Sequence, residues 1–237
     1  MTDGLATRPK ILRGAFVEFG LSVQPLAVVF QFNPVQLTRN RSLTFAFPGA
    51  SGAGSGGEQG AAVPQRTARQ CRGEMSNLLD LQKQQLVTVG DQTIGFDIRL
   101  DASDKLDDRN ASAEQFGIGP QVSTLELMVT PKEESLLGRA VDALLPKGFS
   151  FTRSANPPLV LFIFGRKRVL PVNITTMNIT ETEFSADLNP IRATVAVTLT
   201  VIEGKSIPYL YTKAMTEVMS TVNLASVTDL TNVVIPG

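Results

Sequence analysis

The carboxylates are the side chains of this chain whose spacing could support chemistry. Glu181 and Glu183 lie two residues apart, so on a strand they would share one face, as the paired acids of a glycoside hydrolase require. Such pairs are also common on solvated sheet surfaces, and we favour that interpretation. A denser cluster, suggestive of a calcium or magnesium loop, comprises Asp97, Asp101, Asp104, Asp107 and Asp108. It lacks the glycine and terminal glutamate of an EF-hand, and Lys105 and Arg109 interrupt it, so we expect a solvated turn.

Two basic groups are candidates for binding a partner. Arg66, Arg69 and Arg72 recur every three residues beside Cys71, and residues 166–168 are consecutive cations. A phosphate clamp would need aromatic neighbours or a helix N-terminus, and neither accompanies them. We interpret the first group as a charged edge or an intersubunit salt bridge and the second as an exposed hairpin tip, with partner docking as the alternative for both. Cys71 has no neighbouring base to activate its thiol.

The composition argues against most enzyme classes. The 237 residues include 22 Lys+Arg, 22 Asp+Glu, one Cys, and neither His nor Trp. Without His, the Ser-His-Asp and Cys-His nucleophile pairs and imidazole metal ligands are excluded. A single Cys makes neither an intramolecular disulfide nor a cysteine zinc site. Zero net charge removes the basic field of general nucleic-acid binders. We therefore expect a protein that is not an enzyme and uses no cofactor, metal or nucleic acid.

The hydropathy pattern predicts a protein that is synthesised in the cytoplasm. Hydrophobic residues make up 43% of the chain, but no run approaches the roughly 20 apolar residues that span a bilayer. Residues 1–10 are polar and lack the apolar region of a secretory signal. We expect no insertion into a membrane.

The first half of the chain has the period of strands. Strands are expected within residues 10–19, 26–32, 36–47 and 93–101, and Pro34 ends the second of them. In the fourth, Ile94, Phe96, Ile98 and Leu100 share a face. Residues 48–64 (PGASGAGSGGEQGAAVP) predict a mobile surface loop, with ordering against a neighbouring subunit as the alternative.

The second half predicts two helices and then a hairpin-rich sheet. A helix over 121–130 would have Ser123 as its N-cap and Glu126 completing a capping box. A second helix is expected within 133–145. Further strands are expected at 159–164, 169–180, 182–186 and 192–202, with a hairpin turn at 165–168. The fold class is thus α+β and rich in strands.

An amphipathic helix is expected at the carboxyl end. Apolar residues recur there at spacings of three and four; they are Ile207, Leu210, Tyr211, Ala214, Met215, Val218, Met219 and Val222. Ser206 is a suitable cap, Pro208 is tolerated in the first turn, and Asn223 is expected to end the helix.

Several segments, in order, resemble the tube-type baseplate proteins of contractile injection systems. They span residues 26–37, 93–101, 117–128, 157–165 and 189–202. The most specific motif residues are Phe30, Gln31, Phe32, Asn33 and Pro34, followed by Pro190, Arg192 and Ala193. The resemblance implies a tail-tube β-barrel or sandwich with a flanking helix over 1–204. It also implies a homohexameric ring, acting as a tube initiator between the spike hub, the inner tube and other baseplate proteins. Residues 37–47 and 93–101 are its lumen-lining candidates.

The chain departs from that family after Gly204. Relatives continue into a LysM module, whereas residues 205–237 provide only the expected helix and a tail. We expect the helix either to pack on its own β-domain or to dock on a neighbouring baseplate subunit. The docking residues would be Ile207, Leu210, Tyr211, Met215, Val218 and Met219. The rival function is a soluble β-sandwich that binds a ligand. The particle itself would assemble in the cytoplasm and then stay there or be released.

Overall fold

The computed structural model describes residues 12–20, 24–47, 68–74, 76–107, 109–144 and 156–226. The chain divides into two compact units, one of residues 1–39 with 93–237 and one of residues 40–92. The predicted loop 48–64, Arg66, Asp108 and residues 227–237 lie outside the described residues.

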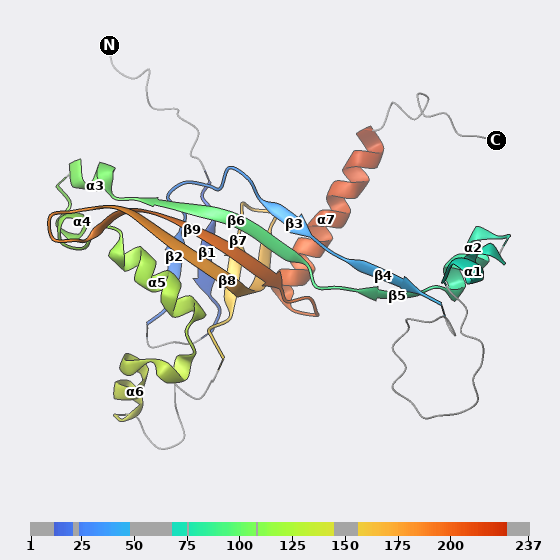
Figure 1. Cartoon of the computed structure of the whole chain (residues 1–237), viewed down its shortest axis with the longest axis horizontal. Helices are drawn as coiled ribbons and strands as arrows, with labels where there is room; N and C mark the ends of the chain where they lie inside the picture. The colour runs from blue at the N-terminus through green and yellow to red at the C-terminus, as the bar shows by residue number, and fades with distance from the viewer. Residues whose placement is uncertain are drawn as a thin grey trace, which may run out of the picture. The chain divides into compact units, whose positions relative to one another are not determined.

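The larger unit is built on a seven-stranded sheet (Figure 1). Its strands follow the order β2-β1-β7-β8-β9-β6-β3, and the registered pairs are antiparallel. The strands are β1 (Ala15–Glu18), β2 (Ala27–Val29), β3 (Thr38–Asn40), β6 (Thr93–Asp101), β7 (Val160–Ile163), β8 (Val169–Phe184) and β9 (Pro190–Val201). The prediction of a strand-rich mixed fold is confirmed.

The central strands β6 and β9 bury one face each, as their alternation predicts. Pairing sets Ile94 opposite Leu199 and Ile98 opposite Val195, with all four side chains fully buried. The other face carries Asp97, Arg99 and the threonines of β9, which are polar and accessible. This period of two is what a half-buried antiparallel sheet requires.

The sheet curls, so that strands distant in its order share one core. The rings of Phe16 (β1), Phe96 (β6) and Phe162 (β7) lie 5.2–6.0 Å apart, centroid to centroid. Phe30, just after β2, meets Phe16 edge-on at 5.1 Å. Such offset and edge-on contacts add to the burial of large apolar surfaces. The four rings therefore join the β2-β1-β7 side to β6 and β9.

Short helices follow β6 on one side of the sheet. They are α3 (Ser103–Asp107), α4 (Ala111–Phe116), α5 (Gly119–Val129), the 3₁₀ turn η1 (Lys132–Glu134) and α6 (Leu136–Asp142). Helix α5 buries Val122, Leu125 and Met128 in the core. The prediction that Ser123 caps this helix is wrong: α5 begins at Gly119 with Pro120 in its first turn, so Ser123 lies inside it.

Two strand predictions are wrong in their boundaries. The expected separate strand at 182–186 is the end of β8, which runs unbroken to Phe184. A bulge between Ile174 and Thr176 leaves β8 able to follow β9 over its whole length. The single strand expected at 36–47 is two strands: β3 joins the large sheet, and β4 (Leu43–Ala46) pairs only with β5.

The smaller unit contains a two-stranded ribbon and two short helices. Strands β4 and β5 (Leu86–Val89) pair antiparallel, and α1 (Ala68–Gly73) and α2 (Leu78–Gln84) lie between them in the chain. Its core is small: Phe47 and Cys71 are buried, with Leu81 packed against them. Asn77 caps α2 by accepting a hydrogen bond from the Leu79 amide.

The carboxyl end forms the long helix α7 (Ile207–Ser226). Its predicted start is confirmed, but the predicted end at Asn223 is wrong, because three more residues remain helical. Among the described helices, none combines the length and the apolar character needed to cross a bilayer.

Candidate functional site

The motif around Phe30 holds the sheet together after β2. Phe30 is fully buried among the core rings. The Gln31 side-chain oxygen accepts a hydrogen bond from the Asp101 amide at 2.9 Å, which ties this segment to the end of β6. Asn33 accepts from the Gly14 amide at 2.9 Å and donates to the Leu12 carbonyl at 2.8 Å. The motif thus positions the amino-terminal strand, while Phe32 stays half-exposed and Pro34 follows in extended chain.

Arg192, in the second motif, is the centre of a polar cluster at the far end of β9. Its Nε lies 2.8 Å from Asp101 Oδ2 and its Nη1 lies 2.7 Å from Glu183 Oε1. Its Nη2 donates to Ser103 Oγ at 3.2 Å. The two carboxylates raise the pKa of Arg192, the bond from Asp101 contributing most. The guanidinium therefore joins β6, β8, β9 and the start of α3.

The same cluster lowers the pKa of Asp101. Desolvation, the largest single effect, raises it, but hydrogen bonds from Ser103 and Arg192 together outweigh desolvation. Pro190 and Ala193 complete the motif structurally. The Pro190 carbonyl accepts from the Ile118 amide at 2.9 Å, and Ala193 is buried against the core.

Glycine is required where α4 meets β9. Gly117 has φ +57°, and a Cβ there would clash with the Pro190 carbonyl oxygen. Asn189 also donates to the Gln115 carbonyl at 2.9 Å. The end of α4 is therefore held directly against the β8–β9 hairpin.

The candidate acidic sites do not assemble into a centre. Glu183 has φ +56°, which breaks the alternation of β8, and its carboxylate binds Arg192 instead of pairing with Glu181. Asp97 lies on the outer face of β6, and Asp104 and Asp107 lie on α3. Among the described residues, no group of three or more acidic, Cys or His side chains could hold a metal.

The predicted arginine group lies in the smaller unit. Arg69 and Arg72 are on α1, and the Arg72 guanidinium lies 5.8 Å from the centroid of the Phe47 ring. Cys71 is buried beside Phe47 rather than displayed among polar residues. This helix packs on Phe47, and the geometry supports no anion clamp.

Helix α7 is anchored to the β7–β8 hairpin by polar bonds. Thr212 Oγ1 donates to the Val169 carbonyl at 2.7 Å and accepts from the Val169 amide at 2.9 Å. The Tyr211 hydroxyl donates to the Arg166 carbonyl at 2.8 Å in the hairpin turn. Tyr209 packs against the core, so the helix does lie on its own sheet.

Most of the predicted apolar stripe of α7 nevertheless faces solvent. Of the residues named for docking, only Met215 is half-buried, and the others are exposed; these are Ile207, Leu210, Tyr211, Val218 and Met219. The face that meets the sheet runs through Tyr209, Thr212 and Met215. The two faces are offset around the helix, because Thr212 contributes by hydrogen bonding and escapes a purely hydrophobic pattern.

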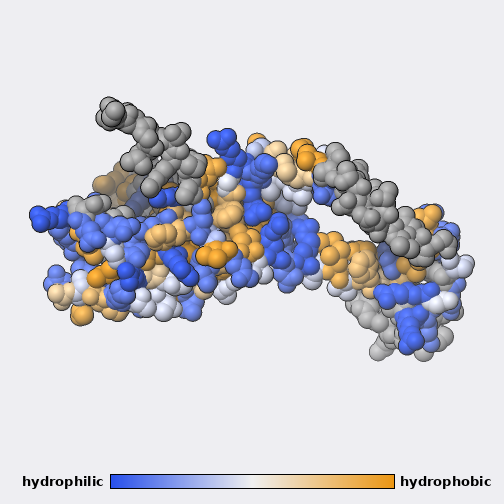
Figure 2. Space-filling model, turned by 90° about the horizontal axis from the view of Figure 1, so that it is seen from above, coloured by the Kyte–Doolittle hydropathy of each residue, from blue (hydrophilic) through white to orange (hydrophobic). Residues whose placement is uncertain are grey.

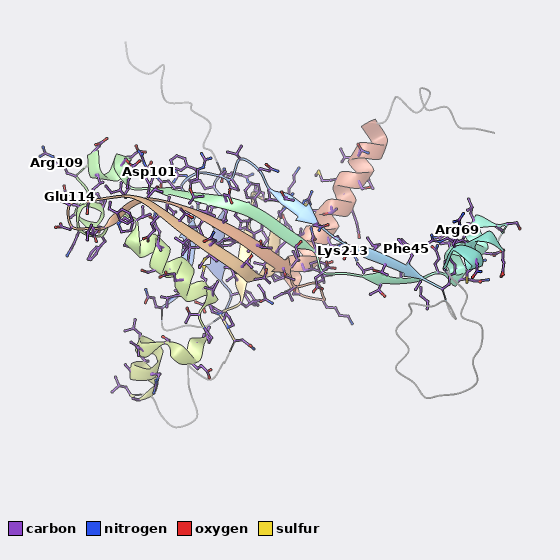
Figure 3. The ribbon with its side chains drawn as sticks, viewed as in Figure 1. Phe45, Arg69, Asp101, Arg109, Glu114 and Lys213 are labelled. Atoms are coloured by element: carbon purple, nitrogen blue, oxygen red, sulfur yellow. The ribbon has the colours of Figure 1, made fainter. Side chains whose placement is uncertain are left out.

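The ribbon β4–β5 exposes apolar side chains, and this feature was not predicted. Leu43 pairs with Val89 and Phe45 with Val87, which places all four on one face. Each is about half exposed, so no other described segment covers that face (Figure 2). Figure 3 shows Phe45 on the ribbon, apart from the helical end that carries Arg69. The alternation of Leu43, Phe45 and Phe47 indicated a strand, but contained nothing to show that its apolar face is uncovered.

A groove of about 420 Å³ lies beside the edge strand β2. It is lined by Arg13, Ala27, Val28, Val29, Gln31, Pro120, Gln121 and Thr124. The volume is within the range of small-molecule sites, but the lining has no aromatic ring and only one cation.

Comparison with known proteins identifies no relative: no protein-family model and no curated protein sequence matches the chain.

Proposed function

We propose that this chain is a structural assembly protein: a subunit of a homohexameric baseplate ring that initiates the inner tube of a phage-tail-like contractile injection system. The ring would lie between the spike hub and the inner tube. The observation that carries the proposal is the β4–β5 ribbon, whose apolar face is uncovered. The motif resemblance at residues 30–34 and 190–194 supplies the kind of assembly.

An isolated ribbon of this composition needs a partner. Two strands alone are marginally stable in water, and unpaired strand edges invite pairing with another chain. The face formed by Leu43, Phe45, Val87 and Val89 is a strip of large apolar side chains without a cover. A ring of identical subunits would cover each strip with its neighbour and remove the free edges.

The outer face of β6 and β9 suits a channel lining. Asp97 and Arg99 alternate there with Thr194 and Thr198 across the paired strands, giving a face of small polar groups and both charges. Such a surface lets cargo pass without strong attachment. We therefore assign the lumen to the 93–101 candidate, and assign β4, within the 37–47 candidate, to the contact between subunits.

The rival function is a soluble ligand-binding module, and the groove beside β2 favours it. Arg13 would supply the charge that orients a ligand there, and the exposed edge of β2 would supply backbone groups. This function needs no association between copies, so the state of assembly distinguishes the two.

The test compares the ribbon with its own opposite face. Phe45→Ser with Val87→Ser removes one cross-strand apolar pair. Thr44→Ser with Thr88→Ser, on the other face of the same strands, is the matched control. We expect wild type and control to form rings visible by electron microscopy, and the apolar-face variant to remain monomeric with an unchanged circular dichroism spectrum. Rings of normal size from the apolar-face variant would refute the role of the ribbon.

A further inference from the structure

The two ends of strand β8 carry uncovered apolar groups. At the β8–β9 hairpin tip, Leu188 is 80% exposed, and Phe184 and Phe116 beside it are about half exposed. At the opposite end of β8, helix α7 leaves Leu210 and Tyr211 uncovered. We name these surfaces the hairpin tip and the α7 end. Neither is covered by another part of the described chain.

The hairpin tip is acidic. Its carboxylates outnumber its cations; they are Asp104, Asp107, Glu114, Glu181 and Asp187. Arg192 is already bound to Asp101 and Glu183, which leaves Arg109 as the remaining described cation of this end. Figure 3 shows Arg109 and Glu114 gathered with Asp101 at this end of the sheet.

The α7 end is basic. Its cations are Arg39, Arg166, Lys167, Arg168 and Lys213, against the carboxylates of Glu203 and Glu217. Within the described part of the chain, Arg166, Lys167, Arg168 and Lys213 form no ion pair. Burial, and then repulsion from Arg39, lower the pKa of Arg168, so positive charges accumulate here without compensation.

One copy cannot bring these surfaces together. Strand β8 spans 16 residues between them, and at about 3.3 Å per residue this is roughly 50 Å. The opposite charges and the apolar groups therefore complement each other between copies, in a head-to-tail contact. We propose that the acidic hairpin tip of one copy docks on the basic, apolar α7 end of the next copy. The inference rests on the proposed assembly role and names a contact of that assembly.

Cysteine cross-linking tests the contact directly. Copies carrying Leu188→Cys are mixed with larger, tagged copies carrying Leu210→Cys and oxidised gently. We expect a mixed-size disulfide dimer. The control replaces Leu188→Cys by Leu136→Cys, because Leu136 on α6 is equally exposed at 80%. A yield from Leu188→Cys no higher than from Leu136→Cys would overturn the proposal.

Charge reversal keeps the proposal testable if the cysteine variants misfold. Arg166→Glu and Asp187→Lys are each expected to weaken the end-to-end association by about tenfold, and the double variant in one chain is expected to restore it. Added salt should weaken the wild-type contact. Failure of the double variant to rescue, with both single variants folded, would contradict the contact.

The outcomes separate this inference from the proposed function. If copies form ribbon-dependent rings without the Leu188–Leu210 cross-link, the assembly role stands and the tip contact is wrong. If copies form neither rings nor cross-links at any concentration, both are wrong.

Discussion

One hydroxyl of helix α7 completes the hydrogen bonding of the first residue of β8. Thr212 Oγ1 lies 2.7 Å from the carbonyl oxygen and 2.9 Å from the amide nitrogen of Val169. Strand β9 supplies its last such bond to Pro171, through the Ile202 amide at 2.9 Å. Thr212 therefore replaces the missing strand residue and fixes α7 on the sheet.

Thr212→Val should destabilise the larger unit, because it leaves the Val169 amide and carbonyl without partners. The expected loss in the free energy of unfolding is about 2 kcal/mol, measured by urea denaturation. Thr212→Ser keeps the hydroxyl and is the control. Equal unfolding midpoints for the two variants would contradict this role of the hydroxyl.

The Asp101–Arg192 bond predicts a stability difference that depends on pH. Hydrogen bonding lowers the pKa of Asp101 below its ordinary value of 3.8 despite its desolvation. The contribution is therefore complete above the unfolded-state pKa and is lost as the pH falls through the lower folded-state pKa. Wild type should exceed Asp101→Asn in urea midpoint near neutral pH, and the gap should close at about pH 2.

Asp97→Asn is the control for that experiment. Asp97 lies on the outer face of the same strand, and its carboxylate forms no ion pair within the described residues. We expect this variant to match wild type at both pH values. A gap between wild type and Asp101→Asn that persists in acid would show that the substitution acts through packing.

The close approach of α4 to β9 predicts opposite effects for two neighbouring glycines. Gly117→Ala places a Cβ against the Pro190 carbonyl and requires an alanine at φ +57°, so it should cost more than about 2 kcal/mol. Gly119→Ala meets nothing within 4 Å at the start of α5 and should be neutral or slightly stabilising. Thermal unfolding followed by circular dichroism checks both. Equal melting temperatures would refute the close approach.

A buried ion pair ties η1 to β1. Lys132 Nζ lies 2.7 Å from Glu18 Oε1, and the Glu18 side chain is only 2% exposed. Lys132→Met would leave that carboxylate without its cation and should cost about 3 kcal/mol. Adding Glu18→Gln to Lys132→Met should recover part of the loss, because it removes the buried charge. Urea unfolding of the two single variants and the double variant measures the coupling.

The parts of the fold that depend on local period were predictable from the sequence. The alternation in 93–101 and 192–202 predicted β6 and β9 with the correct buried faces, because a core on one side imposes a period of two. The spacing of three and four predicted α7 and its first residue.

The parts that depend on distant partners were not predictable. Arg192 binds Asp101 from 91 positions away, and Thr212 binds Val169 from 43 positions away. Residues 36–47 alternate evenly, so the departure of β4 from the large sheet after Asn40 leaves no local signal. The exposed ribbon and the polar cluster, which carry the functional argument, are therefore tertiary features.

Electron microscopy of the purified chain, with its mass measured by light scattering over a range of concentrations, tests the central claim most directly. The account predicts closed rings with a central channel and a mass of six chains of 25.5 kDa each. A mass of 25.5 kDa at every concentration, with no ring in the images, would contradict it.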